Sequence, residues 1–416
     1  MSLQCVIIAG GLATRLRPLT EKIPKVLLEV GGRPFLDHQL TWLARRGVTD
    51  VVLCLGYLGE QVEAFAGDGK RWGLTVRYSH DGATPLGTAG AVRQALDRGL
   101  LAERFLLTWG DSFLPIDPRG VFERFERSGL PALMTVFRNE GRLDASNATL
   151  EGPLARYDKK QGAAKGYRAI DYGLMAFRRE VFERLVPAGT PKDLAAVCGA
   201  LSDADELAGD EAYLRFFEIG SHQGLAEADA FFSRGGPPRG LLVLDRDGVL
   251  DAMILDEKGG EDSPQHVDQV RILDGAPLAL RLLHDAGYTL VLATNQPAAA
   301  KGKTPRAQLE AVHARVLELT QAAGGRISSS HICWHRHEDG CACRKPRPGL
   351  LLEALAAWPG HDLSDSWMVG DRPTDVQAGK AAGLKTAKLG AEAQADWTGT
   401  SLESFARFLL TTRGFF

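Results

Sequence analysis

Short apolar runs alternate with segments of helical spacing along the first half of the chain. A short apolar run bounded by turn-forming residues is typical of a buried strand, whereas apolar residues three and four positions apart indicate a helix. The runs that predict strands are residues 3–9, 51–55, 74–78, 104–108 and 132–137, and helical spacing covers residues 34–47 and 89–98.

The second half repeats the same alternation. Apolar runs at residues 241–244, 289–293 and 366–369 predict strands, and helical spacing covers residues 275–286, 305–323 and 349–357. Alternation of this kind predicts an α/β fold with two domains, each a mostly parallel, doubly wound (Rossmann-like) sheet. Because such sheets bind ligands beyond the carboxyl ends of their strands, the residues directly after each apolar run are the first candidates for chemistry.

A Gly/Pro-rich segment, Ser233-Arg-Gly-Gly-Pro-Pro-Arg-Gly240, separates the two halves. It can continue neither a helix nor a strand, and 416 residues exceed one ordinary core. We therefore expect a first domain at 1–232, a linker at 233–240 and a second domain at 241–390. The last segment, 391–416, has helical apolar spacing and is expected to be a helical tail.

The composition of the chain argues against nucleic-acid and membrane partners. With 49 basic and 52 acidic residues the formal net charge is −3, which argues against sequence-independent binding of nucleic acid. The apolar runs are too short to span a membrane, and the N-terminus lacks the basic region of a signal peptide. We expect a cytoplasmic protein that acts on small molecules, with no nucleic-acid or membrane partner. The sequence leaves its oligomeric state open.

A glycine loop follows the first apolar run. Gly10 and Gly11 allow backbone N–H groups to approach phosphate oxygens, and Thr14, Arg15 and Lys25 follow within the string Gly-Gly-x-x-Thr-Arg-Leu-x-Pro-Leu-Thr…Pro-Lys. The alternative is a tight turn beside solvated basic residues. Because Arg and Lys can neutralise a polyphosphate, the whole string favours a nucleotide-binding loop.

This string resembles that of the sugar-1-phosphate nucleotidylyltransferases, and the likeness runs through most of residues 1–232. Five further motifs carry it: Leu86-Gly87-Thr88-Ala89-Gly90, Gly110-Asp111-Ser112, Tyr157-Asp158-Lys159, Ile170-Asp171-Tyr172-Gly173 and Glu218-Ile219-Gly220. The resemblance implies a nucleotidyltransferase fold. It places Gly87 and Thr88 at the nucleoside, and Lys159, Asp171 and Gly173 on the sugar-phosphate side. It makes Asp111 and Glu218 ligands of Mg²⁺.

The chemistry of that family suits these residues. The phosphate of a sugar 1-phosphate attacks the α-phosphorus of a nucleoside triphosphate, so the protein must align two anions and offset their repulsion. Lys25 and Arg15 are expected at the leaving pyrophosphate. The chain departs from the pattern at Ala13, where the family often has Gly, and at Glu218, where it often has Asp.

Acidic, hydroxyl and basic residues also follow the apolar runs of the second half. Asp245 and Asp247 come after the first run, Thr294 and Asn295 after the second, and Asp371 after the third, while Arg344-Lys345-Pro346 opens a helix. Two carboxylates at a strand end can share one Mg²⁺, which masks their repulsion toward a phosphate. An Asp-rich turn is the alternative, but the ordered set favours a phosphate site.

That set resembles the haloacid dehalogenase-like phosphatases over roughly residues 241–390. The resemblance implies that Asp245 is a nucleophile forming an aspartyl-phosphate and that Asp247 is the general acid and base. Thr294, Asn295, Arg344 and Lys345 are then expected to bind the phosphate or its sugar, and Asp245, Asp247 and Asp371 to hold Mg²⁺. We expect Asp375 to cap a helix or to contact the residues that bind the phosphate, without contacting the phosphate itself.

A cluster of three cysteines and a histidine precedes Arg344. Cys333, His335, Cys341 and Cys343 offer three thiolates and an imidazole, which suit a closed tetrahedral Zn²⁺ site. His337 could replace His335 as the fourth ligand. The alternative to a metal site is a set of free thiols beside a surface histidine. Because four protein ligands leave no open position, we expect a structural zinc that shapes the loop before Arg344 and Lys345.

The zinc loop narrows the resemblance to the branch with heptose bisphosphate phosphatases and histidinol phosphatases. In the heptose pathway, removal of the 7-phosphate precedes nucleotidyl transfer to the 1-phosphate, so we expect a bifunctional enzyme of nucleotide-activated heptose synthesis. We expect GTP to be the nucleotide substrate, and this expectation rests on family association alone. The alternatives are a mannose-1-phosphate or other hexose-1-phosphate nucleotidylyltransferase joined to a phosphatase of other specificity, such as histidinol phosphate, or a non-catalytic sugar-nucleotide sensor.

Overall fold

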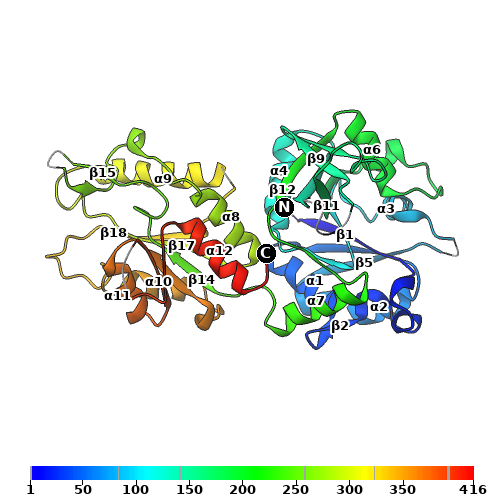
Figure 1. The fold of residues 1–416 in the computed structure, drawn as a ribbon, viewed down its shortest axis with the longest axis horizontal. Coiled ribbons are helices and arrows are strands. Elements are labelled where there is room, and N and C mark those ends of the chain that lie inside the picture. The colour runs from blue at the N-terminus through cyan, green and yellow to red at the C-terminus, as the bar shows by residue number, and fades with distance from the viewer. Residues whose placement is uncertain are drawn as a thin grey trace. The chain divides into compact units, whose positions relative to one another are not determined.

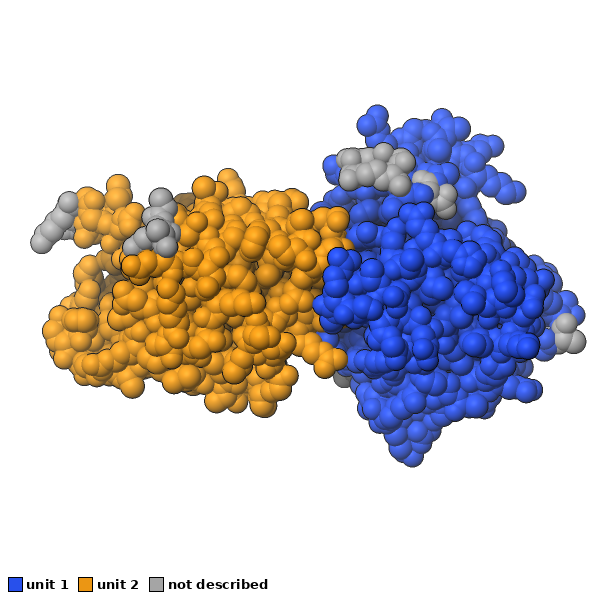
Figure 2. All heavy atoms as spheres, turned by 60° about the horizontal axis from the view of Figure 1, so that its bottom comes forward, with its two compact units in different colours: residues 1–236 blue, residues 237–416 orange. Residues whose placement is uncertain are grey.

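The computed structural model describes residues 2–82, 84–139, 143, 145–256, 259–322, 324–390 and 394–416. The chain forms two compact units, residues 1–236 and 237–416, coloured separately in Figure 2. The division falls within the segment expected to be a linker. Residues 391–393, at the start of the expected tail, lie outside the described residues. Among the described helices, none has the length and apolar character needed to cross a membrane.

The first unit is built on a nine-stranded sheet with the order β5-β4-β1-β6-β11-β8-β12-β10-β9. Figure 1 labels its strands β1, β5, β9, β11 and β12. The strands of the sheet are β1 (Gln4–Ala9), β4 (Asp50–Leu55), β5 (Thr75–His80), β6 (Arg104–Trp109), β8 (Ala132–Arg138), β9 (Ala148–Glu151), β10 (Leu154–Tyr157), β11 (Ala169–Arg178) and β12 (Leu207–Ala212). Two small ribbons flank it, β2 (Glu29–Val30) with β3 (Arg33–Pro34) and β7 (Ser112–Phe113) with β13 (Phe217–Glu218).

The α/β class is confirmed, and this first sheet is mixed. Strands β5, β4, β1 and β6 pair in parallel, whereas β11 pairs antiparallel with both β6 and β8. No helix intervenes between β8 and β11 in the described chain. An antiparallel pair needs no helical crossover between its strands, whereas a parallel pair usually has one.

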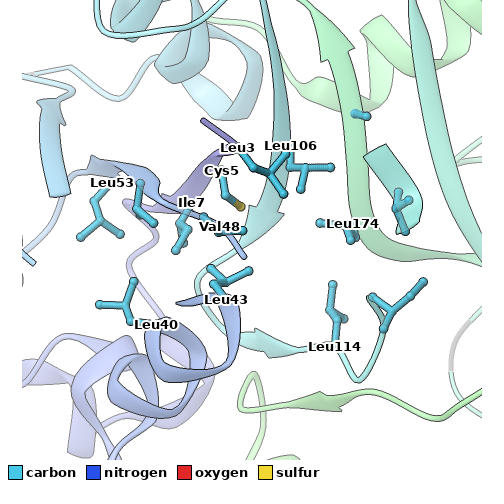
Figure 3. Close-up of a cluster of buried hydrophobic side chains, with 14 of the residues drawn as sticks. Leu3, Cys5, Ile7, Leu40, Leu43, Val48, Leu53, Leu106, Leu114 and Leu174 are labelled. Atoms are coloured by element: carbon cyan, nitrogen blue, oxygen red, sulfur yellow. The ribbon is translucent and has the colours of Figure 1, made fainter. Parts of the chain in front are cut away.

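Helices cover both faces of this sheet. Alternate residues of β1 face opposite layers: Cys5 and Ile7 pack with Leu40 and Leu43 of α1, as Figure 3 shows, and Val6 packs on the other face. The helices are α1 (Phe35–Arg45), α2 (Gly59–Ala66), α3 (Gly87–Asp97), α4 (Pro118–Ser128), α5 (Glu180–Leu185), α6 (Leu194–Asp203) and α7 (His222–Ser233). Helices α1, α2 and α4 contribute to the first core, and α3, α5 and α6 to the second.

The second unit contains a six-stranded, fully parallel sheet with the order β18-β17-β14-β19-β20-β21. Its strands are β14 (Leu241–Leu244), β17 (Thr289–Asn295), β18 (Ser329–Cys333), β19 (Trp367–Gly370), β20 (Lys385–Leu389) and β21 (Trp397–Gly399), and β15 (Ile254–Leu255) pairs with β16 (Glu261–Asp262) outside it. Counted within the main sheet this is the order 3-2-1-4-5-6, in which the connections change direction between β14 and β19.

The helices of this unit are α8 (Ala276–Ala286), α9 (Arg306–Ala322), α10 (Gly349–Ala357), α11 (Pro373–Ala381) and α12 (Leu402–Thr412). The segment after residue 393 belongs to this unit, because β21 extends the sheet and α12 packs against α8. Ser401 caps α12 by accepting a hydrogen bond from the backbone of Ser404. Leu402, Phe405 and Leu409, part of the apolar pattern read from the sequence, are buried.

Candidate active sites

Each unit places its candidate residues at the carboxyl ends of two central strands. In the first unit Gly10 follows β1 and Asp111 closely follows the neighbouring β6, which pairs with β1 in parallel. In the second unit Asp245 follows β14 and Asp371 follows the adjacent β19. These are the positions where the strand order reverses and a crevice opens for ligands.

The glycine loop after β1 is shaped by close backbone contacts. A Cβ on Gly10 would lie 3.1 Å from the backbone nitrogen of Gly56, whereas Gly11 has open space beside it. Ala13 adopts a left-handed conformation with a φ of 47°. This explains the departure noted in the sequence, because glycine reaches that conformation at lower cost, and alanine holds the same turn.

The structure brings Lys25 and Asp111 together as an ion pair with both side chains largely buried. Glu218 lies on the neighbouring ribbon, where it pairs in register with Ser112, and the backbone of Ile219 donates to the carbonyl of Asp111 at 2.9 Å. Arg15 Nη2 lies 4.0 Å from Glu218 Oε1. Four predicted residues therefore gather at one site, with two carboxylates that can hold Mg²⁺ beside two basic side chains.

The loop expected at the nucleoside and the lysine expected at the sugar phosphate, Lys159, both contact Asp193. Thr88 Oγ1 donates to Asp193 Oδ1 at 3.1 Å, and Lys159 Nζ donates to Asp193 Oδ2 at 3.1 Å. Gly87 has a φ of 70°, and a Cβ there would lie 2.7 Å from the carbonyl oxygen of Lys192. Glycine is therefore required at this position, and Asp193 is a contact that the sequence did not reveal.

Asp171 and Gly173 lie in β11, at the point where its register with β8 shifts. The backbone N–H of Gly173, which has a φ of 103°, donates to Asp171 Oδ1 at 2.9 Å. Burial raises the pKa of Asp171 to about 7, with the Gly173 hydrogen bond and the charge of Lys159 acting in the opposite direction. A carboxyl group in this state can exchange hydrogen bonds with sugar hydroxyls as donor or acceptor.

A second carboxylate that sequence reasoning missed is Asp81, directly after β5. It lines a pocket of about 390 Å³ with Gly56 and His80. Its Oδ1 is buried without a hydrogen-bond partner among the described residues, and burial raises its pKa. The signal was available, since Asp81 follows a strand just as Gly10 and Gly56 do, but no known motif drew attention to it.

In the second unit, Lys345 and Asp245 form a buried ion pair. Lys345 Nζ lies 2.8 Å from Asp245 Oδ2 and 2.6 Å from Asp375 Oδ1. Burial by itself lowers the pKa of Lys345, but the charges of Asp245 and Asp375 raise it overall. The lysine is therefore a fixed cation beside the expected nucleophile.

Asp245, Asp371 and Asp375 each place a carboxylate oxygen within 4.8 Å of the others. Asp371 Oδ1 is buried without a hydrogen-bond partner among the described residues, and burial followed by the charge of Asp245 raises the pKa of Asp371 to about 6. A Cβ on Gly248 would lie 2.4 Å from Asp371 Oδ2. Any residue other than glycine at this position would therefore displace the Asp371 carboxylate. Clustered hard oxygen donors with an unsatisfied oxygen fit Mg²⁺.

Asp247, which the sequence also assigned to the Mg²⁺ site, accepts several hydrogen bonds through its carboxylate. Its Oδ1 accepts from Arg246 Nη2 at 2.7 Å, and its Oδ2 accepts from Ser263 Oγ at 2.9 Å and from Gln296 Nε2 at 2.5 Å. The third carboxylate of the cluster, by distance, is that of Asp375. Asp375 also receives the backbone N–H of Arg372 at 3.0 Å, so it serves as the expected cap as well.

Thr294 and Asn295 end β17 beside this cluster. Gln296 Nε2 donates to the buried Thr294 Oγ1 at 3.1 Å. Asn295 Nδ2 donates to the carbonyl of Lys345 at 3.1 Å, and its Oδ1 accepts from the backbone of Lys345 at 3.2 Å. Asn295, expected to contact the sugar phosphate, thus fixes the backbone that carries Lys345.

The expected zinc ligands converge. Cys333 Sγ lies 3.7 Å from Cys341 Sγ and from His335 Nδ1, and Cys343 Sγ lies 3.3 to 3.4 Å from the other three ligand atoms. A tetrahedron with Zn–S bonds of about 2.3 Å has edges of about 3.8 Å, and the four atoms lie close enough to this spacing to fit a zinc ion. His335, not His337, belongs to this cluster. Arg344 Nη1 donates to the carbonyl of His335 at 3.1 Å, which links the cluster to the segment with Lys345.

Comparisons with known proteins agree with this division. A family model described as nucleotidyl transferase matches residues 4–145, and one described as HAD-hydrolase-like matches residues 342–396. Over 143 residues the chain is 41% identical to the D-glycero-beta-D-manno-heptose-1,7-bisphosphate 7-phosphatase of Pseudomonas aeruginosa, covering 34% of this chain and 76% of that protein.

The relatives also include sugar-phosphate nucleotidyltransferases. The N-acetylmuramate alpha-1-phosphate uridylyltransferase of Neisseria meningitidis is 30% identical over 233 residues, which are 55% of this chain and 97% of that protein. The D-glycero-alpha-D-manno-heptose 1-phosphate guanylyltransferase of Aneurinibacillus thermoaerophilus is 33% identical over 122 residues, 29% of this chain and 52% of that protein.

Two sites with different chemistry, each built on its own sheet, define a two-unit enzyme of nucleotidyl transfer and phosphate-ester hydrolysis. The chain belongs to the sugar-phosphate nucleotidyl transferases through its first unit and to the haloacid dehalogenase-like phosphatases, in the heptose bisphosphate phosphatase branch, through its second.

Proposed function

We propose that the protein catalyses two consecutive steps in the synthesis of a nucleotide-activated heptose. The second unit removes the 7-phosphate of D-glycero-D-manno-heptose 1,7-bisphosphate, and the first transfers a nucleotidyl group, GMP from GTP, to the resulting heptose 1-phosphate. One observation carries this proposal: a single chain joins relatives of a heptose 1,7-bisphosphate 7-phosphatase and of a heptose 1-phosphate guanylyltransferase. The product of the first reaction has the 1-phosphate that the second requires.

In the phosphatase unit, Asp245 attacks the phosphorus of the 7-phosphate, and the bond from phosphorus to the sugar oxygen breaks. Asp247 protonates the leaving oxygen, then takes a proton from water as that water attacks the aspartyl-phosphate and releases orthophosphate. Lys345 and Thr294 bind the transferring group. Asp245, Asp247 and Asp371 are the residues that would hold Mg²⁺, which would supply charge neutralisation. The zinc held by Cys333, His335, Cys341 and Cys343 is structural.

In the nucleotidyltransferase unit, the glycine loop from Gly10 to Thr14 binds the triphosphate, and Gly87 and Thr88 contact the nucleoside. Lys25 and Arg15 neutralise the leaving pyrophosphate, and Lys159 holds the sugar phosphate. Asp111 and Glu218 are the residues that would hold Mg²⁺, which supplies further charge neutralisation. The sugar phosphate oxygen forms the new bond to the α-phosphorus, and pyrophosphate departs with the electrons of the broken bond.

The two activities must also agree on the anomer of the heptose. The phosphatase relative is named for a beta-heptose bisphosphate and the guanylyltransferase relative for an alpha-heptose 1-phosphate. Because nucleotidyl transfer does not change the anomeric carbon, both units must accept the same anomer. We propose the alpha anomer, so that the phosphatase unit differs from its named relative in this respect.

A second candidate for the first unit is uridylyl transfer to an N-acetylated sugar acid 1-phosphate. The uridylyltransferase relative matches across 97% of its length, a longer match than that of the guanylyltransferase. This candidate leaves the phosphatase activity unchanged but makes the two reactions independent.

The deciding experiment supplies the purified full chain and Mg²⁺ with each anomer of heptose 1,7-bisphosphate and each nucleoside triphosphate. Parallel reactions contain N-acetylmuramate α-1-phosphate with UTP. Mass spectrometry should detect GDP-heptose and orthophosphate from the alpha bisphosphate. A product only from N-acetylmuramate 1-phosphate and UTP would establish the second candidate, and no product from any pair would overturn both.

A further inference from the structure

Asp193 joins two parts of the nucleotidyltransferase site that are distant in the sequence. It caps the first turn of α6, where its Oδ1 accepts from the backbone of Ala195 at 3.0 Å and from Thr88 Oγ1 at 3.1 Å. Its Oδ2 accepts from Lys159 Nζ at 3.1 Å. One carboxylate thus contacts the loop expected at the nucleoside and the lysine expected at the sugar phosphate.

The backbone around Asp193 is tied firmly to that loop. Thr88 Oγ1 accepts from the N–H of Leu194 at 2.7 Å, and Lys192 exchanges backbone hydrogen bonds of 2.9 Å with Leu86 and Ala89. The loop and the start of α6 therefore form one hydrogen-bonded unit. Asp193 has a defined position even though its side chain is 55% exposed.

The carboxylate of Asp193 is ionised at neutral pH. Burial favours its neutral form, but the hydrogen bonds from Ala195, Lys159 and Thr88, with the charge of Lys159, outweigh burial and lower its pKa. Lys159 itself is 58% exposed on a long, flexible side chain. An exposed ion pair of this kind contributes little to stability, because solvent screens it and both side chains lose conformational freedom. Its consequence is the orientation of the Lys159 ammonium.

We propose that Asp193 is a positioning residue that orients Lys159 toward the phosphate of the sugar substrate and anchors it to the nucleotide loop through Thr88. An ammonium has three N–H donors, so Lys159 can keep its bond to Asp193 while it donates to a phosphate oxygen. This inference rests on the proposed function of the first unit, since it concerns the sugar 1-phosphate of nucleotidyl transfer.

The variant Asp193→Asn separates orientation from folding. Asparagine keeps the Oδ1 acceptor for Ala195 and Thr88 and is as good a helix cap as aspartate. Its Nδ2 cannot accept from Lys159. Because a phosphate contact present in both the ground and transition states affects binding alone, we expect the KM for heptose 1-phosphate to rise by about tenfold. The kcat and the KM for GTP should change by less than about twofold.

A double-mutant cycle with Lys159→Ala tests the route of the effect. Without Lys159, Asp193→Asn should change the KM for heptose 1-phosphate no further, because the two residues act through one contact. Glu206→Gln is the matched control: it removes another exposed ion pair of this unit, with Arg184, and should leave every constant unchanged. Thermal unfolding curves confirm that each variant is folded.

Two results would overturn the inference while leaving the proposed function intact. One is an active wild-type enzyme whose KM for heptose 1-phosphate is unchanged by Asp193→Asn. The other is a cycle in which the two substitutions act additively. A wild-type chain that converts no sugar 1-phosphate with any nucleoside triphosphate would instead overturn the proposed function, and this inference with it.

Discussion

Lys345 lies 2.6 Å from Asp375, and both side chains are only 1% exposed. The same ammonium lies 2.8 Å from Asp245, so one buried cation faces two carboxylates. Of the two, Asp245 occupies the strand end where a nucleophile is expected, whereas Asp375 lies in the first turn of α11. Asp375 therefore holds the lysine in place beside the expected nucleophile.

This arrangement predicts that Asp375→Asn lowers the phosphatase kcat by about 10²-fold, since a misplaced Lys345 stabilises the transferring phosphoryl group less well. Asparagine can still accept the backbone N–H of Arg372, so the cap of α11 remains. The measurement is orthophosphate release from heptose 1,7-bisphosphate. Asp362→Asn, which alters a cap elsewhere in the same unit, serves as the control and should retain full activity. An Asp375→Asn enzyme with an unchanged kcat would contradict the positioning role.

The two sites should be separable by single substitutions. We expect Asp245→Asn to abolish phosphate release because the amide cannot act as the nucleophile, while nucleotidyl transfer from supplied heptose 1-phosphate continues. Lys25→Ala should do the converse, since the leaving pyrophosphate loses a cation. Each variant is assayed for both products. If either substitution abolished both activities in a folded protein, the model of two independent sites would be wrong.

Removal of the zinc ligands should impair only the phosphatase. Wild-type protein is expected to contain one Zn²⁺ per chain by elemental analysis, and Cys343→Ser to contain much less. Because Arg344 and Lys345 follow the cluster directly, loss of its shape should lower the phosphatase kcat by about tenfold or more. Chelation should reproduce the loss, and Zn²⁺ but not Mg²⁺ should reverse it. Unchanged phosphatase activity in metal-free protein would argue against a structural zinc.

The elements that sequence reasoning placed well are those with local signals. The run at 241–244 became β14 with the same limits, and residues 349–357 became α10 with the same limits. The ligand atoms of Cys333, His335, Cys341 and Cys343 also converge as their spacing predicted. In each case a few neighbouring residues determine the outcome, through burial of a strand or the reach of ligands within one loop.

Features that depend on distant pairing were not visible. The antiparallel course of β11 between β6 and β8 depends on tertiary packing, so the alternation of elements alone suggested a parallel sheet. Asp193 reaches Thr88 and Lys159 across 105 and 34 positions of sequence. The hydrogen bonds from Ser263 and Gln296 to the Asp247 carboxylate also join segments that no sequence motif connects.

The raised pKa of Asp171 predicts how the stability of the protein depends on pH. Burial raises its pKa in the folded protein to about 7, from an ordinary value near 3.8. Between these values the folded state retains a proton that the unfolded state loses, so the free energy of unfolding should fall as the pH rises from about 4 to about 7. Above pH 7 this contribution is constant. Asp171→Asn, which cannot ionise, should show a weaker decline, measured as the difference between wild-type and variant denaturation midpoints across this range. A constant difference would mean that the pKa of Asp171 is the same in the folded and in the unfolded protein.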